Sequence, residues 1–168
     1  MFNLRKTALA GLADVAIGAG WLARASAQEN SSSPIVTYFD HQKVDASFSK
    51  AVAAGGTMTL WSRTSSKGTY NVNTQSRESV SGACGNEGCS HKNFTAVVYV
   101  VSGAATLVIG GPAVAAKTVV PDKFGGQPIQ SGESHRISKG DVIIVPPDRI
   151  HWYKNVEAPF RYLEVQTP

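Results

Sequence analysis

The chain has 168 residues, of which 42% are hydrophobic and 17% charged, and its formal net charge is +4. This length provides one domain with a sizeable buried core. Three of the 16 basic residues and one of the 12 acidic residues precede Gln28, which leaves a net charge of +2 from there onward. No basic segment interleaved with aromatic residues occurs, so the composition gives no support to a nucleic-acid partner.

Residues 1–27 have the pattern of a secretory signal. Two basic residues near the start precede a mostly small and apolar run, and Ala25-Ser26-Ala27 forms a small-residue cleavage site. An uncleaved membrane anchor is the alternative, but the run is interrupted by Asp14 and is shorter than the roughly 20 apolar residues that span a bilayer. We therefore expect export, to the periplasm or the medium, with no stable membrane anchor after cleavage.

Residues 28–40 form a polar tether, and one short helix follows. Asp40 is a suitable N-cap, and Gly55-Gly56 ends the helical pattern. Within this segment Val44, Phe48 and Val52 lie at helical spacing, so we expect them to form the buried face of the helix.

From Thr57 onward the pattern is all β. Short extended runs are separated by glycine, proline and asparagine, as in a sandwich or a barrel. These runs are 57–62, 69–73, 96–102, 104–109, 134–137, 142–145, 150–153 and 160–165. The longest irregular piece, residues 111–131, has a length typical of a lid or a binding loop.

Residues 97–103 are apolar on both faces of the expected strand. Such a strand has to be covered on both sides. One face would line the interior of the barrel, and the other would meet a second sheet or another subunit. We therefore expect a homodimer.

The two cysteines, Cys84 and Cys89, lie close together in a glycine-rich segment. In an oxidising compartment a local disulfide is expected, and it would stabilise the fold by roughly 2 kcal/mol. Free thiols are the alternative, as is a role for the Cys89 thiolate as a metal ligand near His91.

The most informative segment is residues 140–155, which predicts a strand, a tight turn and a second strand. Pro146-Pro147-Asp148 supplies the turn, and His151 follows it immediately. Because side chains alternate along a strand, Tyr153 shares the face of His151. An imidazole in this position suits a metal or small-ligand site at the mouth of a β-barrel.

This segment resembles the second signature of the cupin superfamily. Gly140, Pro146, His151 and Asn155 stand at the spacings of that signature, and Asp148 replaces an inner glycine. Residues 97–103, followed by residues 104–111, look like the end of the first cupin signature. The resemblance implies a single jelly-roll β-barrel with one short N-terminal helix over residues 41–168.

The resemblance also implies metal ligands. His91 and His151 match two of the four ligand positions of metal-binding cupins, whereas Cys89 and Ala96 stand where a histidine and a carboxylate are expected. Two imidazoles suit a divalent transition metal (Zn, Fe, Mn, Ni or Cu), but they bind it weakly without a third ligand. The candidates for that third ligand are Cys89, Glu164 and His135.

If position 96 faces inward, alternation places an apolar pocket lining beside Tyr153, made of Ala96, Val98 and Val100. We therefore expect an exported cupin that binds a small molecule in its barrel, with a weakly held divalent metal. One alternative is a metal-dependent enzyme, namely an oxygenase, isomerase, lyase or decarboxylase, with Tyr153 as an acid or base. The other is a metal-free binding or interaction module.

Overall fold

The structure is a computed structural model that describes residues 36–78, 88–110, 117–120, 123–125, 129 and 132–168. The chain divides into two units, Met1–Val36 and Thr37–Pro168. All described helices and strands belong to the second unit. The expected signal, residues 28–35 of the expected tether and Cys84 lie outside the described residues. Within the described part of the chain, no helix is long and apolar enough to cross a membrane.

The helix, α1, spans His41–Ala53. The side chain of Asp40 caps it by accepting a hydrogen bond from the backbone N–H of Lys43, as the sequence predicts. Its buried residues are Ser47, Phe48 and Ala51, so the prediction for Val52 is wrong: this side chain is 43% exposed. The helix packs on β1 and β2. Its buried face is rotated by about one residue from the face expected from the sequence.

Among the described residues, nine strands follow the helix, and with them the all-β prediction is confirmed. They are β1 Thr57–Ser65, β2 Gly68–Arg77, β3 Cys89–His91, β4 Thr95–Ile109, β5 Lys117–Val120, β6 Lys123–Gly125, β7 Glu133–Ser138, β8 Val142–Val145 and β9 His151–Thr167. All the pairings between them are antiparallel. The order along the sheet is β1-β2-β9-β3-β6-β5, and β4 pairs with β7, β8 and β9.

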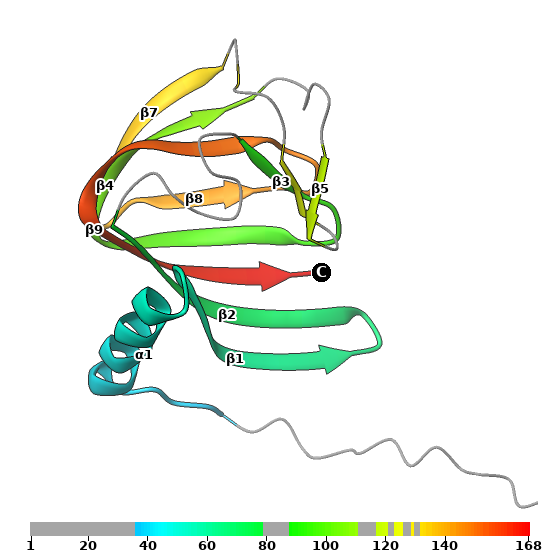
Figure 1. Cartoon of the computed structure of the whole chain (residues 1–168). Helices are drawn as coiled ribbons and strands as arrows, with labels where there is room; N and C mark the ends of the chain where they lie inside the picture. The colour runs from blue at the N-terminus through cyan, green and yellow to red at the C-terminus, as the bar shows by residue number, and fades with distance from the viewer. Residues whose placement is uncertain (1–35, 79–87, 111–116, 121–122, 126–128, 130–131) are drawn as a thin grey trace, which may run out of the picture. The chain divides into compact units, whose positions relative to one another are not determined.

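The two longest strands, β4 and β9, bend together and pair over both of their halves (Figure 1). Residues 95–100 pair with residues 162–167, and residues 106–109 pair with residues 151–154. Between the two stretches the register shifts repeatedly, which is how a paired strand turns a corner. Each of these strands is predicted from the sequence as two separate runs, because the bend interrupts the apolar alternation.

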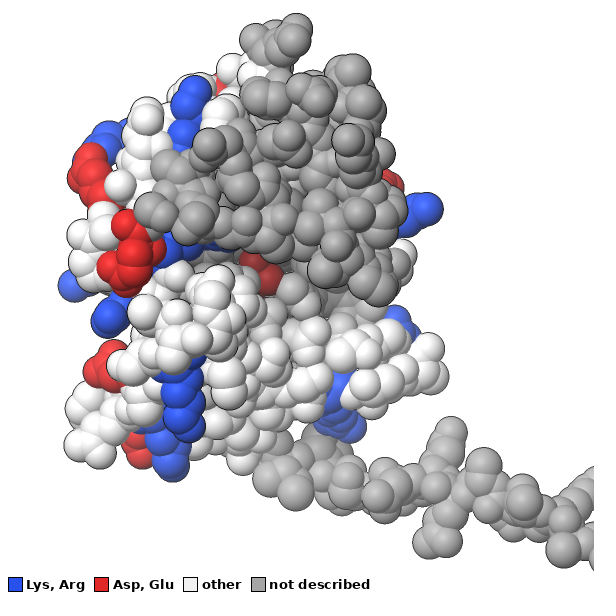
Figure 2. Space-filling view, viewed as in Figure 1, with Lys and Arg blue, Asp and Glu red and all other residues white. Residues whose placement is uncertain are grey.

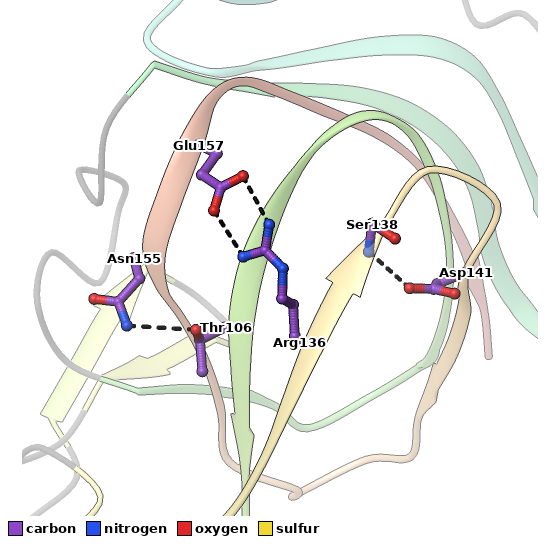
Figure 3. A network of polar contacts seen from close by, with 6 residues as sticks. All are labelled: Thr106, Arg136, Ser138, Asp141, Asn155 and Glu157. Atoms are coloured by element: carbon purple, nitrogen blue, oxygen red, sulfur yellow. Dashed lines mark hydrogen bonds and ion pairs between the residues drawn. The ribbon is translucent and has the colours of Figure 1, made fainter.

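Exposed polar contacts near the bend connect β9 with β7 and with β4 (Figure 3). The guanidinium of Arg136 on β7 makes a two-pronged ion pair with the carboxylate of Glu157 on β9, at 2.7 and 2.8 Å. Asn155 donates a hydrogen bond to the hydroxyl of Thr106 on β4 at 3.4 Å. Because these groups are exposed, we expect them to add little free energy of folding.

The inner face of the sheet holds the hydrophobic core. Buried apolar side chains of β4, β7, β8 and β9 form one cluster, which consists of Ala96, Val98, Val100, Ala105, Leu107, Ile137, Ile143, Val145, Tyr153, Phe160 and Tyr162. The outer face of β1 and β2 is covered by α1, where the hydroxyls of Ser47 and Thr74 share a buried hydrogen bond of 2.7 Å. Near the helix, β2 therefore has two buried faces.

The outer face of β4 and β8 remains exposed, although it is apolar. Register brings Ile144 next to Val97 and Val142 next to Tyr99, and Ile144 is 65% exposed. The expected apolar outer face of residues 97–103 is therefore present. The homodimer stays a prediction.

Gly103, at the bend of β4, provides a test of how tightly the two long strands pack. A Cβ atom at Gly103 would lie 2.5 Å from the carbonyl oxygen of Pro159, whereas one at Gly140 would meet nothing within 4 Å. Both glycines have positive φ, at 72° and 96°. We expect Gly103→Ala to lower the free energy of unfolding by more than about 3 kcal/mol. Gly140→Ala should cost only about 1 kcal/mol, because it adds left-handed strain without crowding.

Urea denaturation of both variants measures this difference. Since the two glycines share the backbone strain, the excess at Gly103 reports the contact between β4 and β9. An equal decrease in the free energy of unfolding in the two variants would contradict close packing of Gly103 against β9.

Candidate functional site

The strand β3 and the turn before β9 bring His91 and His151 together. Cys89 on β3 is the register partner of His151 on β9. The backbone N–H of Asp148, in the turn, donates a hydrogen bond of 2.7 Å to the carbonyl oxygen of His91. Asp148 has a φ of 59°, the left-handed conformation that glycine adopts most easily. The turn therefore accommodates the aspartate at the glycine position of the cupin signature.

The two imidazoles are buried and adjacent. His91 is 5% exposed, His151 is 8% exposed, and their ring centroids lie 4.8 Å apart. Phe94 stacks on His91 with a centroid separation of 4.4 Å. The Nδ1 atom of His151 lies 3.2 Å from the carbonyl oxygen of Arg149. The structure thus brings together the two residues that the resemblance to cupins implies as metal ligands.

The three candidates for a further ligand have different positions. Cys89 shares the face of His151 but is disulfide-bonded, and Cys84 lies outside the described residues. His135 is exposed on β7, where it pairs with Glu133 at 2.8 Å. Glu164 faces inward and is 8% exposed. Among the described residues, no group of three or more histidine, cysteine, aspartate or glutamate side chains is placed to hold a metal ion.

Tyr153 connects the histidines to the rest of the inner face. Its ring meets the ring of His151 edge-on at 6.0 Å and lies 5.4 Å from the ring of Tyr162. Burial raises the pKa of the Tyr153 phenol well above its usual range, with smaller contributions in the same direction from Tyr162 and Glu164. The phenol is therefore protonated at neutral pH, so it can donate a proton or a hydrogen bond but does not act as a base.

Arg77 lies beside both tyrosines. Its Nε atom donates a hydrogen bond of 3.0 Å to the hydroxyl of Tyr162, and its guanidinium carbon lies 5.6 Å from the centre of the Tyr153 ring. The Tyr162 phenol is the main cause of a raised pKa of Arg77. A guanidinium between two aromatic rings is stabilised by cation–π attraction. The inner face thus carries a permanent positive charge about one side chain away from the histidine pair.

Beyond Arg77 the inner face of β1, β2 and β9 is polar. Thr57 donates to the amide oxygen of Gln75 at 2.7 Å, and Thr59 donates to that of Asn73 at 2.9 Å. Gln166 donates to the carboxylate of Glu164 at 2.6 Å. We call the residues Thr57, Thr59, Asn73, Gln75, Glu164 and Gln166 the polar inner face.

The expected pocket residues all face inward. Ala96, Val98 and Val100 are at most 1% exposed, and Tyr153 is 8% exposed. All four belong to the hydrophobic core cluster. Their contact with a ligand stays a prediction.

Arg77 and the polar inner face do not emerge from the sequence. Their placement depends on the register of β2 with β9, in which Gln75 faces Tyr162 and Asn73 faces Glu164. The one available signal is the run of polar residues on one face of β2, which departs from the alternation expected of a strand that covers an apolar core.

Known proteins support the fold. Residues 86–167 match the cupin family. An uncharacterized conserved protein with a double-stranded β-helix domain from Klebsiella pneumoniae superposes with a TM-score of 0.52 at 15% identity, over 80% of this chain and 91% of that one. Residues 86–167 are therefore similar to the cupin family, and the fold class predicted from the sequence is confirmed.

Two further structures are more distant. KdgF from a Halomonas species is 15% identical, with a TM-score of 0.45 over 67% of this chain and 78% of that one. An iron(II) form of HppE is 9% identical, with a TM-score of 0.36 over 59% of this chain and 42% of that one. No curated protein matches the chain.

The turn that holds the two histidines together provides a test of Asp148. We expect Asp148→Ala to lower the free energy of unfolding by about 1 kcal/mol, because alanine adopts the left-handed conformation reluctantly. Asp148→Gly should be nearly neutral, because glycine adopts it without strain. Denaturation midpoints of the two variants check this; an alanine variant as stable as the glycine variant would contradict the strained turn.

The raised pKa of Tyr153 predicts a loss of stability at alkaline pH. In the unfolded chain the phenol releases its proton near pH 10, whereas in the folded protein it retains the proton. Its contribution to stability is therefore complete below about pH 10 and declines as the pH rises further. We expect Tyr153→Phe to flatten this decline in denaturation curves measured from neutral to strongly alkaline pH. The exposed Tyr38 provides the control, since Tyr38→Phe should leave the slope unchanged.

Proposed function

We propose that the protein is an exported cupin that binds a small molecule inside its barrel, next to a divalent transition metal held weakly by His91 and His151. The observation that carries the proposal is the buried imidazole pair, with ring centroids 4.8 Å apart on two strands. The pattern of residues 1–27 supports export. Zn, Fe, Mn, Ni and Cu all accept imidazole nitrogen.

The residues fit a metal with an incomplete protein ligand set. Imidazole is a good ligand, but a site closed by protein groups needs more than two. A metal held by His91 and His151 would act as a Lewis acid with coordination positions left for donor atoms of the bound molecule. The chain's own residues would position that molecule: Tyr153 donates a hydrogen bond from a protonated phenol, and the apolar side chains around it exclude water.

A metal-free binding module is the second candidate function. It is favoured by Ala96, which stands at the carboxylate position of metal-binding cupins, and by the disulfide state of Cys89. The same polar and aromatic side chains would then bind the small molecule directly. A metal-dependent enzyme remains an alternative, in which the protonated Tyr153 is the available acid.

Metal content decides between these candidates. The full chain and its variants are loaded with Zn²⁺, Mn²⁺, Fe²⁺, Ni²⁺ or Cu²⁺ and analysed for bound metal after dialysis. We expect His151→Ala to weaken metal binding by more than about 100-fold, because it removes one of two ligands. His135→Ala is the matched control: this histidine is exposed on β7, and its loss should leave binding unchanged.

Circular dichroism shows whether His151→Ala remains folded. Metal bound equally well by the wild type and His151→Ala would contradict the assigned ligands. Wild-type protein that takes up none of the five metals would leave the metal-free binding module as the function.

A further inference from the structure

We propose that the polar inner face binds a small, neutral, hydroxyl-rich molecule of the monosaccharide or polyol class. The inference rests on the proposed function in one respect, that the barrel interior takes a ligand, and it does not depend on a metal. It assigns the chemical class of that ligand from side chains on β1, β2 and β9.

Two buried amides on β2 offer hydrogen-bond donors to the interior. Asn73 is 6% exposed and Gln75 is 7% exposed. Within the described residues, their side-chain hydrogen bonds use only the amide oxygens, which accept from Thr59 and Thr57 on β1. Each amide has two further N–H donors. Neither amide nitrogen is among the fully buried atoms without a partner, so the N–H groups can reach a molecule in the interior, whose hydroxyl oxygens would accept from them.

A buried carboxylate stands opposite these donors. Glu164 on β9 is the register partner of Asn73, and the described residues engage only its Oε1 atom, through Gln166. A carboxylate accepts several hydrogen bonds, so the second oxygen can accept from a ligand O–H group. Donors and an acceptor thus lie side by side on neighbouring strands. A hydroxyl group both donates and accepts, so a molecule with several hydroxyls matches this arrangement.

On the other side of β9, the neighbouring strand β4 forms an apolar wall of the interior. Val98 and Val100 on β4 are the register partners of Glu164 and Tyr162 on β9. The aromatic rings of Tyr153 and Tyr162 continue this wall toward His151. A monosaccharide carries hydroxyls at its edge and C–H groups on its ring faces, so its edge suits β2 and its faces suit the valines and tyrosines.

The charges of this region favour a neutral ligand. The inner face of β2 and the C-terminal half of β9 carries one cation, Arg77, and one anion, Glu164, and each influences the ionisation of the tyrosine between them. A ligand with a net charge would be attracted by one and repelled by the other. In Figure 2 the surface over β1 and β2 is mostly uncharged. Thr57 and Thr59 on the edge strand β1 are exposed, which gives a ligand access from solvent.

Ligand-observed NMR on the full chain after chelator treatment tests the proposal without any metal. The probes are glucose, galactose, mannose, xylose and myo-inositol at millimolar concentration, with glucuronate as the charged counterpart of glucose. We expect saturation transfer from the protein to at least one neutral probe. The side-chain NH₂ signals of Asn73 and Gln75 should shift on addition of that probe.

Two variants identify the site. Gln75→Leu and Glu164→Gln should each weaken binding by about tenfold, the effect of losing one buried hydrogen bond. Gln42→Leu makes the same change as Gln75→Leu at an exposed position of α1 and should bind like the wild type. Glu164→Gln preserves the shape of the side chain, so it keeps the test valid if Gln75→Leu unfolds.

Binding that is lost in both inner-face variants and kept in Gln42→Leu supports the proposal. Saturation transfer to no neutral probe overturns it, and so does tighter binding of glucuronate than of glucose. Because this experiment uses metal-free protein, its result is independent of the metal analysis. Sugar binding without metal uptake would refute the metal site alone, and metal uptake without sugar binding would refute only the assigned ligand class.

Discussion

The pairing of β4 with β9 is the interaction on which the rest of the structure depends. Both strands run through the same bend, and each half of one pairs with a half of the other. One half of β9 carries His151 and Tyr153, and the other half carries Tyr162 and Glu164. Because the bend folds the sheet back on itself, residues from both halves reach one interior. Gly103 allows this closure, since a side chain there would collide with the backbone of β9.

The interior that results has two chemically different parts joined by aromatic rings. The histidine pair and Phe94 lie at the end next to β3, and the polar inner face lies on β1, β2 and the far half of β9. Tyr153 contacts both parts, through His151 and through Tyr162. Buried polar groups cost free energy unless they are hydrogen-bonded, so a fold that places several of them beside an apolar core gives up stability there. Such a local loss of stability is typical of sites that bind a ligand.

The sequence predicts those features that depend on local chemistry. The turn at Pro146-Pro147-Asp148 and the histidine after it follow from the turn residues and the apolar run before them, and both are present. The strand β3 is missed because three residues in a glycine-rich segment give no periodic signal. Features that depend on register are also missed. The inward direction of Glu164 cannot be inferred, because both faces of residues 160–165 mix charged and apolar side chains. The place of Arg77 becomes apparent only when β2 is aligned with β9.

The hydrogen bond from the Asp148 backbone to the His91 carbonyl has a further consequence for recognition. Together with the pairing of Cys89 and His151, it holds the two backbone segments that carry the imidazoles next to each other. The site is therefore preorganised, and a partner entering it pays little conformational entropy to bring the rings together. For the proposed metal or ligand, selectivity would then depend on how well it fits the fixed positions of the two imidazoles.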